Sequence, residues 1–164
     1  ALEGSGLVWN HLRTIWFQQN MFGWAAGIKQ GVFPICSGEG QVPWMNLDDA
    51  ADASLALLLK GDSSWDNKVW TITGPELLTS AQVADIVSKA LGKEIKFSSP
   101  TPEDQLKGLV GAGWPEWQAR GVVELLGTFE KKQVEFVSPD FKTLTGKEGT
   151  KMADWFETVK ASFV

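Results

Sequence analysis

Strand-like segments alternate with helix-like segments over the first hundred residues, and this alternation restricts the fold of the chain more than any other feature. Short apolar runs predict strands, whereas apolar residues spaced three and four apart predict helices. The expected strands cover residues 7–12, 31–37, 42–47, 68–73 and 94–98. The expected helices between them cover residues 17–28, 48–59 and 79–91. This order predicts a single domain, 1–164, of the α/β class with some parallel strand pairing.

Several helix ends can be read directly from the sequence. Thr79 and Gln82 have the spacing of a capping box, and Gly92 stands where a left-handed helix end is expected. Thr101 followed by Pro102 predicts a second capped start. A further helix is expected over residues 115–129. A last helix is expected to carry the apolar stripe Met152, Trp155, Phe156, Val159 and Phe163.

The composition excludes several classes of function. A formal net charge of −5 gives no basic surface for nucleic acid. With one histidine, His11, and one cysteine, Cys36, we expect neither a metal site nor an internal disulfide. No apolar run approaches the roughly 18 residues of a membrane-spanning helix, so we expect no membrane partner. The single cysteine favours a reduced setting, and we expect the protein in the cytoplasm. Because the chain has no tyrosine, a phenol cannot act as its acid or base.

Three local patterns resemble functional motifs but have simpler explanations. Residues 108–113, GLVGAG, reverse the glycine spacing of a dinucleotide-binding loop and follow a helical segment, so we predict a turn between helices. Asp48 and Asp49 could be paired catalytic carboxylates, but their position predicts helix capping instead. His11 lies in an expected strand, which favours a hydrogen-bonded structural role.

Side chains suited to ligand binding follow the first expected strand. Ligands of open α/β sheets bind beyond the carboxyl ends of the strands. Four residues are expected there: Trp16, Phe17, Gln19 and Asn20. Their rings offer apolar area, and their amides can orient a polar ligand without a charge. Trp44 is a candidate for a further wall of the same pocket. The alternative is that these residues simply pack a helix on the sheet.

The sequence SGLVWNHLRTIWFQQNMFGWA resembles a segment of the NmrA-like proteins, SGL-x-(W/Y)-T-x-LRP-x-x-F-x-(E/Q)-N. These proteins are atypical short-chain dehydrogenase/reductases of the NAD(P)-binding Rossmann superfamily. The likeness continues collinearly through residues 31–59, 68–97, 101–126 and 144–156. Thr14 stands where the family usually has proline, and His11 replaces a smaller residue. The departure at Thr14 is minor.

The resemblance implies that these residues form the C-terminal portion of an NmrA-like fold. Residues 1–75 would supply late strands of a Rossmann-like parallel sheet. Residues 76–164 would form mainly a small, helical substrate-binding subdomain. The family's N-terminal Rossmann half, with its glycine-rich loop and any catalytic tyrosine or lysine, has no counterpart in this sequence, so we expect the chain to lack it.

The resemblance also implies roles for individual residues. The cofactor of the intact parent would be NADP or NAD, and we expect no tight binding of it to this chain alone. The residues expected near the nicotinamide are Trp16, Phe17, Gln19 and Asn20. The residues expected on the side of the small-molecule substrate are Trp44, Trp24 and Phe33. No catalytic residue is assigned.

The function implied is reduction of a small carbonyl or quinone-like substrate by the parent protein, and we expect the chain alone to be inactive. Two alternatives remain. One is a non-enzymatic NAD(P)-sensing regulator or interaction module. The other is a shortened protein that binds an apolar small molecule or guides a non-redox rearrangement. Because a divided sheet exposes an unpaired edge, the chain should associate with its missing half or with itself.

Overall fold

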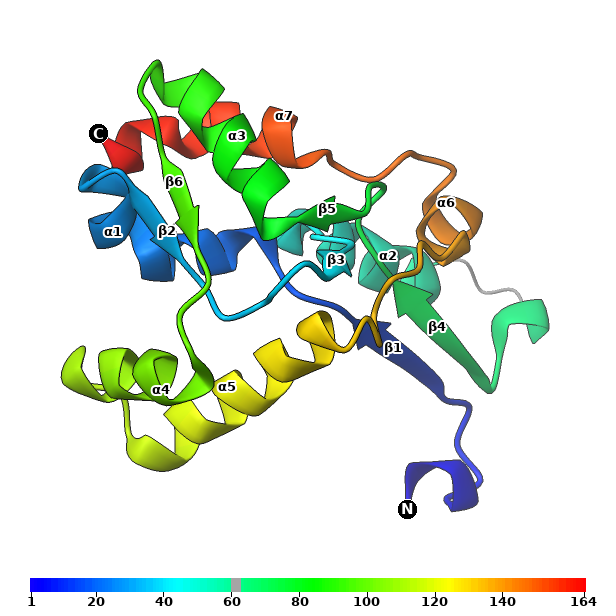
Figure 1. The fold of residues 1–164 in the computed structure, drawn as a ribbon. Helices are drawn as coiled ribbons and strands as arrows, with labels where there is room; N and C mark the ends of the chain where they lie inside the picture. Colours follow the sequence, from blue (N-terminus) through cyan, green and yellow to red (C-terminus); the bar gives the residue numbers. More distant parts are fainter. Residues whose placement is uncertain (60–62) are drawn as a thin grey trace.

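The computed structural model describes residues 1–59 and 63–164, in which strands and helices alternate as the sequence predicts (Figure 1). The strands are β1 (Asn10–Thr14), β2 (Val32–Pro34), β3 (Gln41–Val42), β4 (Lys68–Ile72), β5 (Leu78–Thr79) and β6 (Lys96–Ser98). The α-helices are α1 (Ala25–Lys29), α2 (Leu47–Leu59), α3 (Ser80–Leu91), α4 (Pro102–Gly111), α5 (Glu116–Glu130), α6 (Asp140–Thr145) and α7 (Met152–Val159). Short 3-10 helices are η1 (Leu2–Gly4), η2 (Gln18–Trp24), η3 (Ser63–Trp65) and η4 (Lys160–Phe163). The α/β class is confirmed.

The strands of the described chain form three pairs. β1 pairs with β4 in parallel, β2 pairs with β6 in parallel, and β3 pairs with β5 antiparallel. The expected parallel pairing is therefore present. The pairs β2–β6 and β3–β5 each join a strand before residue 75 to one after it. The division into residues 1–75 and 76–164 stays a prediction.

The first strand lies later in the chain than the sequence predicts. β1 begins at Asn10 rather than at residue 7, and Leu7 and Val8 are exposed. Its partner β4 begins at Lys68, directly after Asn67, whose φ of 57° interrupts extended backbone. Trp9 N–H donates to the Asn67 side chain rather than to a backbone carbonyl, so the regular parallel ladder begins only at Asn10. Of the predicted strand, residues 7–9 thus lie before the paired segment and residues 10–12 belong to it.

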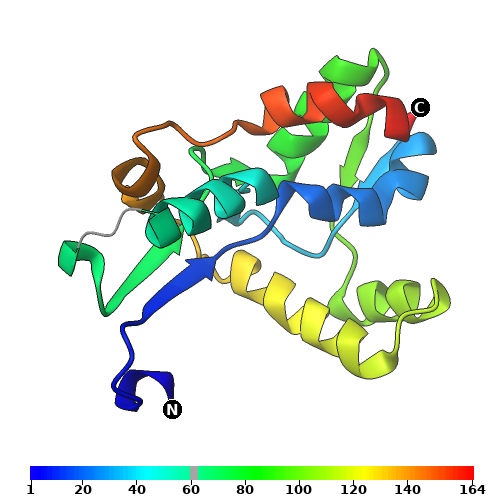
Figure 2. The same ribbon diagram turned by 180° about the vertical axis from the view of Figure 1, so that it is seen from behind.

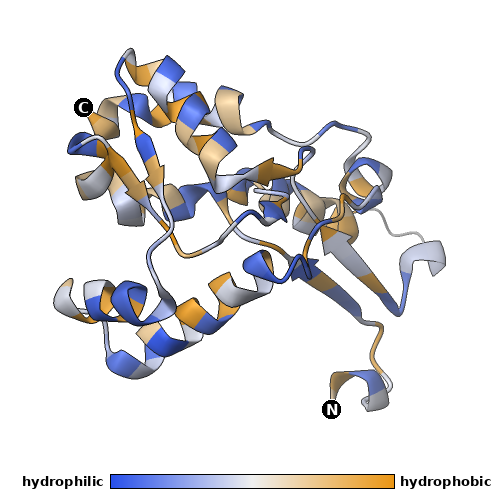
Figure 3. Cartoon of the chain, in the orientation of Figure 1, coloured by the Kyte–Doolittle hydropathy of each residue, from blue (hydrophilic) through white to orange (hydrophobic). Residues whose placement is uncertain are grey.

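Two groups of buried side chains hold these elements together. The larger one lies among α1, α3, α7, β2 and β6, and includes Phe33, Val87 and Phe156. The smaller one lies where α2 and α6 pack on the β1–β4 pair, and includes Trp70 and Phe141. In the view from behind, α2 lies in line with η2 (Figure 2). Figure 3 shows hydrophobic residues along β2 and in stripes on α3 and α5, alternating with hydrophilic ones.

The helix ends with local sequence signals are confirmed. Thr79 Oγ1 accepts from Gln82 N–H and Gln82 Oε1 accepts from Thr79 N–H, which completes the capping box of α3. Gly92 ends that helix with a φ of 65°. Thr101 Oγ1 accepts from Asp104 N–H at the start of α4. The turn between α4 and α5, which was predicted at residues 108–113, lies at residues 112–115, because residues 108–111 complete α4.

The start of α2 corrects one prediction. Asn46 Oδ1, rather than an oxygen of Asp48 or Asp49, accepts from Asp48 N–H. The Asp49 carboxylate is instead hydrogen-bonded to a distant loop. Its Oδ2 accepts from Thr150 N–H at 2.7 Å, and its Oδ1 accepts from Thr150 Oγ1 at 2.8 Å. Asp49 is therefore a buried structural link between α2 and the segment before α7.

Other elements differ in extent from the sequence predictions. Residues 17–28 form two pieces, η2 and then α1, rather than one helix. The last apolar stripe is confirmed, and its helix α7 passes into η4 before Phe163. Helix α6 was not expected, because its six residues are too few for a periodic pattern. His11 Nε2 lies 3.0 Å from Glu3 Oε1, in keeping with a hydrogen-bonded histidine.

Candidate ligand cavity

A cavity of about 410 Å³ lies between the η2–α1 segment and the α4–α5 hairpin. This volume is within the range of small-molecule sites. Most of its wall is apolar, and none of the residues that line it is ionisable. The lining residues are Trp16, Gln19, Asn20, Gly23, Trp24, Gly27, Pro34, Gln105, Gly108, Leu109, Ala112, Trp114 and Val122. A ligand held here would be neutral where it contacts this wall, because a buried charge requires a partner.

Four of the residues predicted for ligand binding line this cavity. They are Trp16, Gln19 and Asn20 from the cofactor group and Trp24 from the substrate group. β1 ends at Thr14, so the chain passes from the strand into this wall within two residues. The geometry thus places these side chains beyond the carboxyl end of a parallel strand, where open α/β sheets bind ligands. Their binding roles stay predictions.

The other three predicted residues lie behind the wall or away from it. Trp44 is 2% exposed, and its ring meets Trp16 edge-on at 6.3 Å between centroids. Phe33 is fully buried and meets Trp24 edge-on at 5.7 Å. Phe17 packs against the smaller core beside the β1–β4 pair. Trp44 and Phe33 therefore support the indoles that line the cavity and do not line it themselves.

The two predicted amides have different surroundings. Gln19 Nε2 donates to Asn46 Oδ1, and Gln19 Oε1 accepts from Leu47 N–H at 3.1 Å. Both ends of this amide are therefore engaged in holding the start of α2. The Asn20 side chain has no hydrogen-bond partner among residues 1–59 and 63–164, and it lines the cavity. Asn20 is the amide that remains available to a ligand.

Gln105 is a cavity residue that the sequence reasoning did not identify. It is the buried residue of α4, 8% exposed, and its Oε1 accepts from Cys36 N–H at 3.1 Å. The available signal was its spacing from Leu109 and Ala112, which share its helix face and also line the cavity. Burial raises the pKa of the neighbouring Cys36 thiol, which keeps that side chain protonated and neutral.

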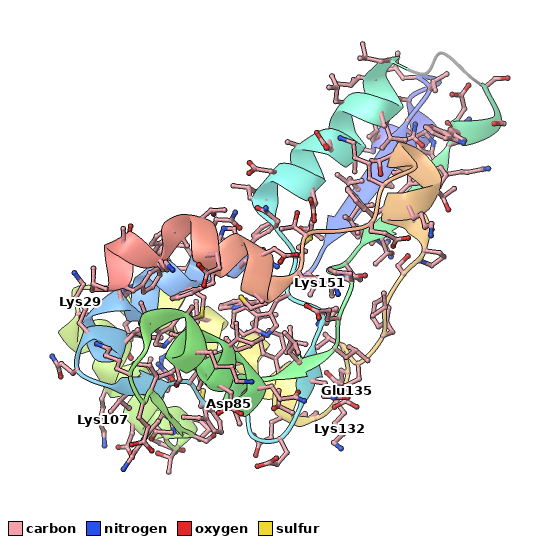
Figure 4. All side chains as sticks on the ribbon, turned by 90° about the horizontal axis from the view of Figure 1, so that it is seen from above. Lys29, Asp85, Lys107, Lys132, Glu135 and Lys151 are labelled. Carbon is pink, nitrogen blue, oxygen red and sulfur yellow. The ribbon has the colours of Figure 1, made fainter. Side chains whose placement is uncertain are left out.

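The charged side chains of the described residues are outside the cavity wall. Figure 4 labels six of them, none of which belongs to the cavity wall: Lys29, Asp85, Lys107, Lys132, Glu135 and Lys151. Within the described part of the chain, no group of three or more histidine, cysteine, aspartate or glutamate side chains could hold a metal ion. None of the described helices is long and apolar enough to cross a membrane.

Comparison with known proteins shows what the sequence and the fold are similar to. No family model matches the sequence. The chain is 28% identical over 163 residues to an NAD(P)H azoreductase of Xenophilus azovorans, covering 99% of this chain and 56% of that protein. It superposes on an NADPH-dependent quinone oxidoreductase of Escherichia coli with a TM-score of 0.88 and 24% identity, covering 97% of this chain and 57% of that one.

A transcriptional regulator has a similar fold, with a lower TM-score and a lower sequence identity. NmrA, a negative transcriptional regulator solved with NADP, gives a TM-score of 0.69 at 14% identity over 96% of this chain and 54% of its own. The quinone oxidoreductase has also been solved with NADPH. The chain therefore has the fold of the matching part of these proteins, which include a quinone reductase and NmrA. The chain spans about half the length of the proteins that it matches.

Proposed function

We propose that this chain forms the substrate side of an NAD(P)H-dependent reductase that acts on a small, neutral carbonyl or quinone-like substrate. The observation that carries the proposal is the cavity, whose wall combines indole rings, a free Asn20 amide and no ionisable group. Such a wall suits a flat, uncharged ring with a polar substituent. The likeness to an azoreductase and a quinone oxidoreductase supports the same substrate class.

The cavity residues fit the nicotinamide end of the cofactor better than its phosphates. Trp16 offers a ring face and Asn20 offers a partner for a carboxamide, whereas no lysine or arginine lines the cavity. The phosphates would therefore be bound by residues outside this wall. The cofactor, when bound, supplies a hydride. The chain's own residues would orient the rings, exclude water and donate hydrogen bonds to the acceptor.

Binding of a neutral quinone to the 164-residue chain tests the proposal. We expect 2,3-dimethyl-1,4-naphthoquinone to bind measurably in isothermal titration calorimetry. Replacing Trp24 by alanine should weaken this binding about tenfold, because the ligand loses one apolar face. Trp117→Ala is the matched control, since Trp117 is exposed on α5 and lies outside the wall. Absence of quinone binding, or equal loss in both variants, would contradict the proposal. We expect no NADPH turnover by this chain alone.

A non-catalytic, cofactor-sensing role is the second candidate. It is favoured by the absence of any acid or base among the lining residues of the cavity. A full-length parent that binds NADP(H) but reduces no quinone or carbonyl would support it. Tryptophan quenching by apolar ligands and not by NADP(H) would instead support a shortened small-molecule binder.

We also propose that the 164-residue chain self-associates in solution when no other partner is present. Helix α2 exposes Leu47, Leu55 and Leu58 on one face, and the adjoining β1–β4 sheet has two strands in the described chain. Exposed apolar faces and open strand edges favour association. Light scattering after gel filtration should give a mass above 18.0 kDa. Leu58→Glu should lower that mass, and a monodisperse wild-type monomer would contradict the proposal.

A further inference from the structure

Gln105 is a polar residue in a position where an apolar one is usual. Helix α4 is largely exposed, and Gln105 is its buried residue. Its neighbours along the same face, Leu109 and Ala112, line the cavity with it. A buried amide is retained at low cost only when its polar atoms have partners. The partners of the two ends of this amide therefore indicate what it does.

One end of the amide is held by the backbone of the chain. Gln105 Oε1 accepts from Cys36 N–H at 3.1 Å. The neighbouring N–H groups are bonded elsewhere, Ile35 N–H to Ser98 O and Ser37 N–H to Ile35 O. Because a backbone N–H can only donate, the oxygen of the amide must face Cys36. The amide orientation is thereby determined, and the NH2 group is turned to the other side.

The NH2 end of Gln105 is unused within the protein. Among residues 1–59 and 63–164, the side chain of Gln105 makes no hydrogen bond other than the one from Cys36 N–H. Three side-chain polar atoms of the described residues are fully buried and have no hydrogen-bond partner: Trp16 Nε1, Gln18 Oε1 and Trp44 Nε1. Gln105 Nε2 is not one of them. The Nε2 atom therefore keeps some accessible surface, and the open space that Gln105 lines is the cavity.

We propose that Gln105 is a specificity-determining residue that donates a hydrogen bond from Nε2 to a carbonyl-type oxygen of the ligand. The inference rests on the proposed function, because it concerns the same cavity. Backbone N–H of Cys36 orients the amide before the ligand arrives, so little freedom is lost on binding. Asn20 lies on the η2 side of the cavity and Gln105 on the α4 side. The site therefore selects a neutral ring that carries an acceptor oxygen over the corresponding hydrocarbon.

A matched pair of ligands tests this inference. The probes are 2,3-dimethyl-1,4-naphthoquinone and 2,3-dimethylnaphthalene, which share the ring shape and differ in the two oxygens. We expect the wild-type chain to bind the quinone about tenfold more tightly, the effect of one buried hydrogen bond. In Gln105→Met this preference should disappear while the hydrocarbon affinity stays close to that of the wild type. Gln118→Met, on the exposed face of α5, should keep the preference.

A second variant keeps the test decisive if Gln105→Met does not fold. Gln105→Glu retains an acceptor for Cys36 N–H and removes the amide donor, so at pH 8 it should also lose the preference for the quinone. If either variant retains the tenfold preference, Gln105 is not the donor. If the wild type binds both probes equally, the inference is overturned while ring binding, and with it the proposed function, stands. If the wild type binds neither probe, both are overturned.

Discussion

Replacing Gly40 by alanine should lower the free energy of unfolding by about 3–5 kcal/mol. A Cβ at this position would lie 1.8 Å from Phe129 O and 2.4 Å from Phe129 C, so the last turn of α5 would have to move. Backbone atoms cannot rotate aside as a side chain does, and the cost is therefore that of displacing a helix. The midpoint of urea unfolding, followed by circular dichroism, measures this loss.

Gly127→Ala is the control for this variant, because it makes the same chemical change in the helix that Gly40 contacts. A Cβ at Gly127 meets no atom within 4 Å. Since alanine favours the helix over glycine, this variant should be more stable than the wild type by roughly 0.5–1 kcal/mol. Similar unfolding midpoints for the two variants would show that α5 does not pack on Gly40 as described.

Replacing Gln18 by leucine should lower the free energy of unfolding by about 2–4 kcal/mol. Gln18 is fully buried, and its Nε2 donates to Trp44 O at 3.2 Å and to Thr150 O at 2.9 Å. Leucine fills similar space and leaves both carbonyl groups without this donor. The amide joins η2 to two distant loops, so the loss should also expose the loop before α7 to faster hydrogen exchange.

Gln118→Leu separates this effect from that of a general increase in hydrophobicity. Gln118 is exposed on α5, and the same substitution there should change the unfolding free energy by no more than about 0.5 kcal/mol. Urea unfolding of the two variants side by side gives the comparison. A Gln18→Leu protein as stable as Gln118→Leu would mean that the two carbonyl bonds contribute nothing.

The elements predicted correctly from the sequence are those whose bonds connect near neighbours. The capping box of α3 joins Thr79 to Gln82, and the start of α4 joins Thr101 to Asp104. Both are readable because donor and acceptor are three residues apart. The first strand was misplaced because its limits depend on Asn67 and Lys68, which are close to it only in space. Asn46 was missed as the cap of α2 for a different reason, since the two aspartates after it were equally plausible caps.

The candidate site was likewise predicted in part from the sequence. The sequence identified the segment after β1, and Trp16, Gln19, Asn20 and Trp24 lie together on one wall of the cavity. It could not separate Gln19 from Asn20, because only the position of Asn46 shows that the first amide is engaged. It also could not place Trp44 and Phe33 behind the wall, since an aromatic side chain suits a core and a pocket equally well.

The sequence alone determined the α/β class, the helices with local caps and the segment from which half of the cavity wall is built. Each of these depends on residue type and on spacing within a few positions of the chain. The tertiary structure decided which amide is free, and it brought Gln105 of α4 to the backbone of Cys36, 69 residues away. That contact depends on how α4 packs against the loop after β2, because a hydrogen bond requires two groups to meet in space and local spacing does not specify such a meeting.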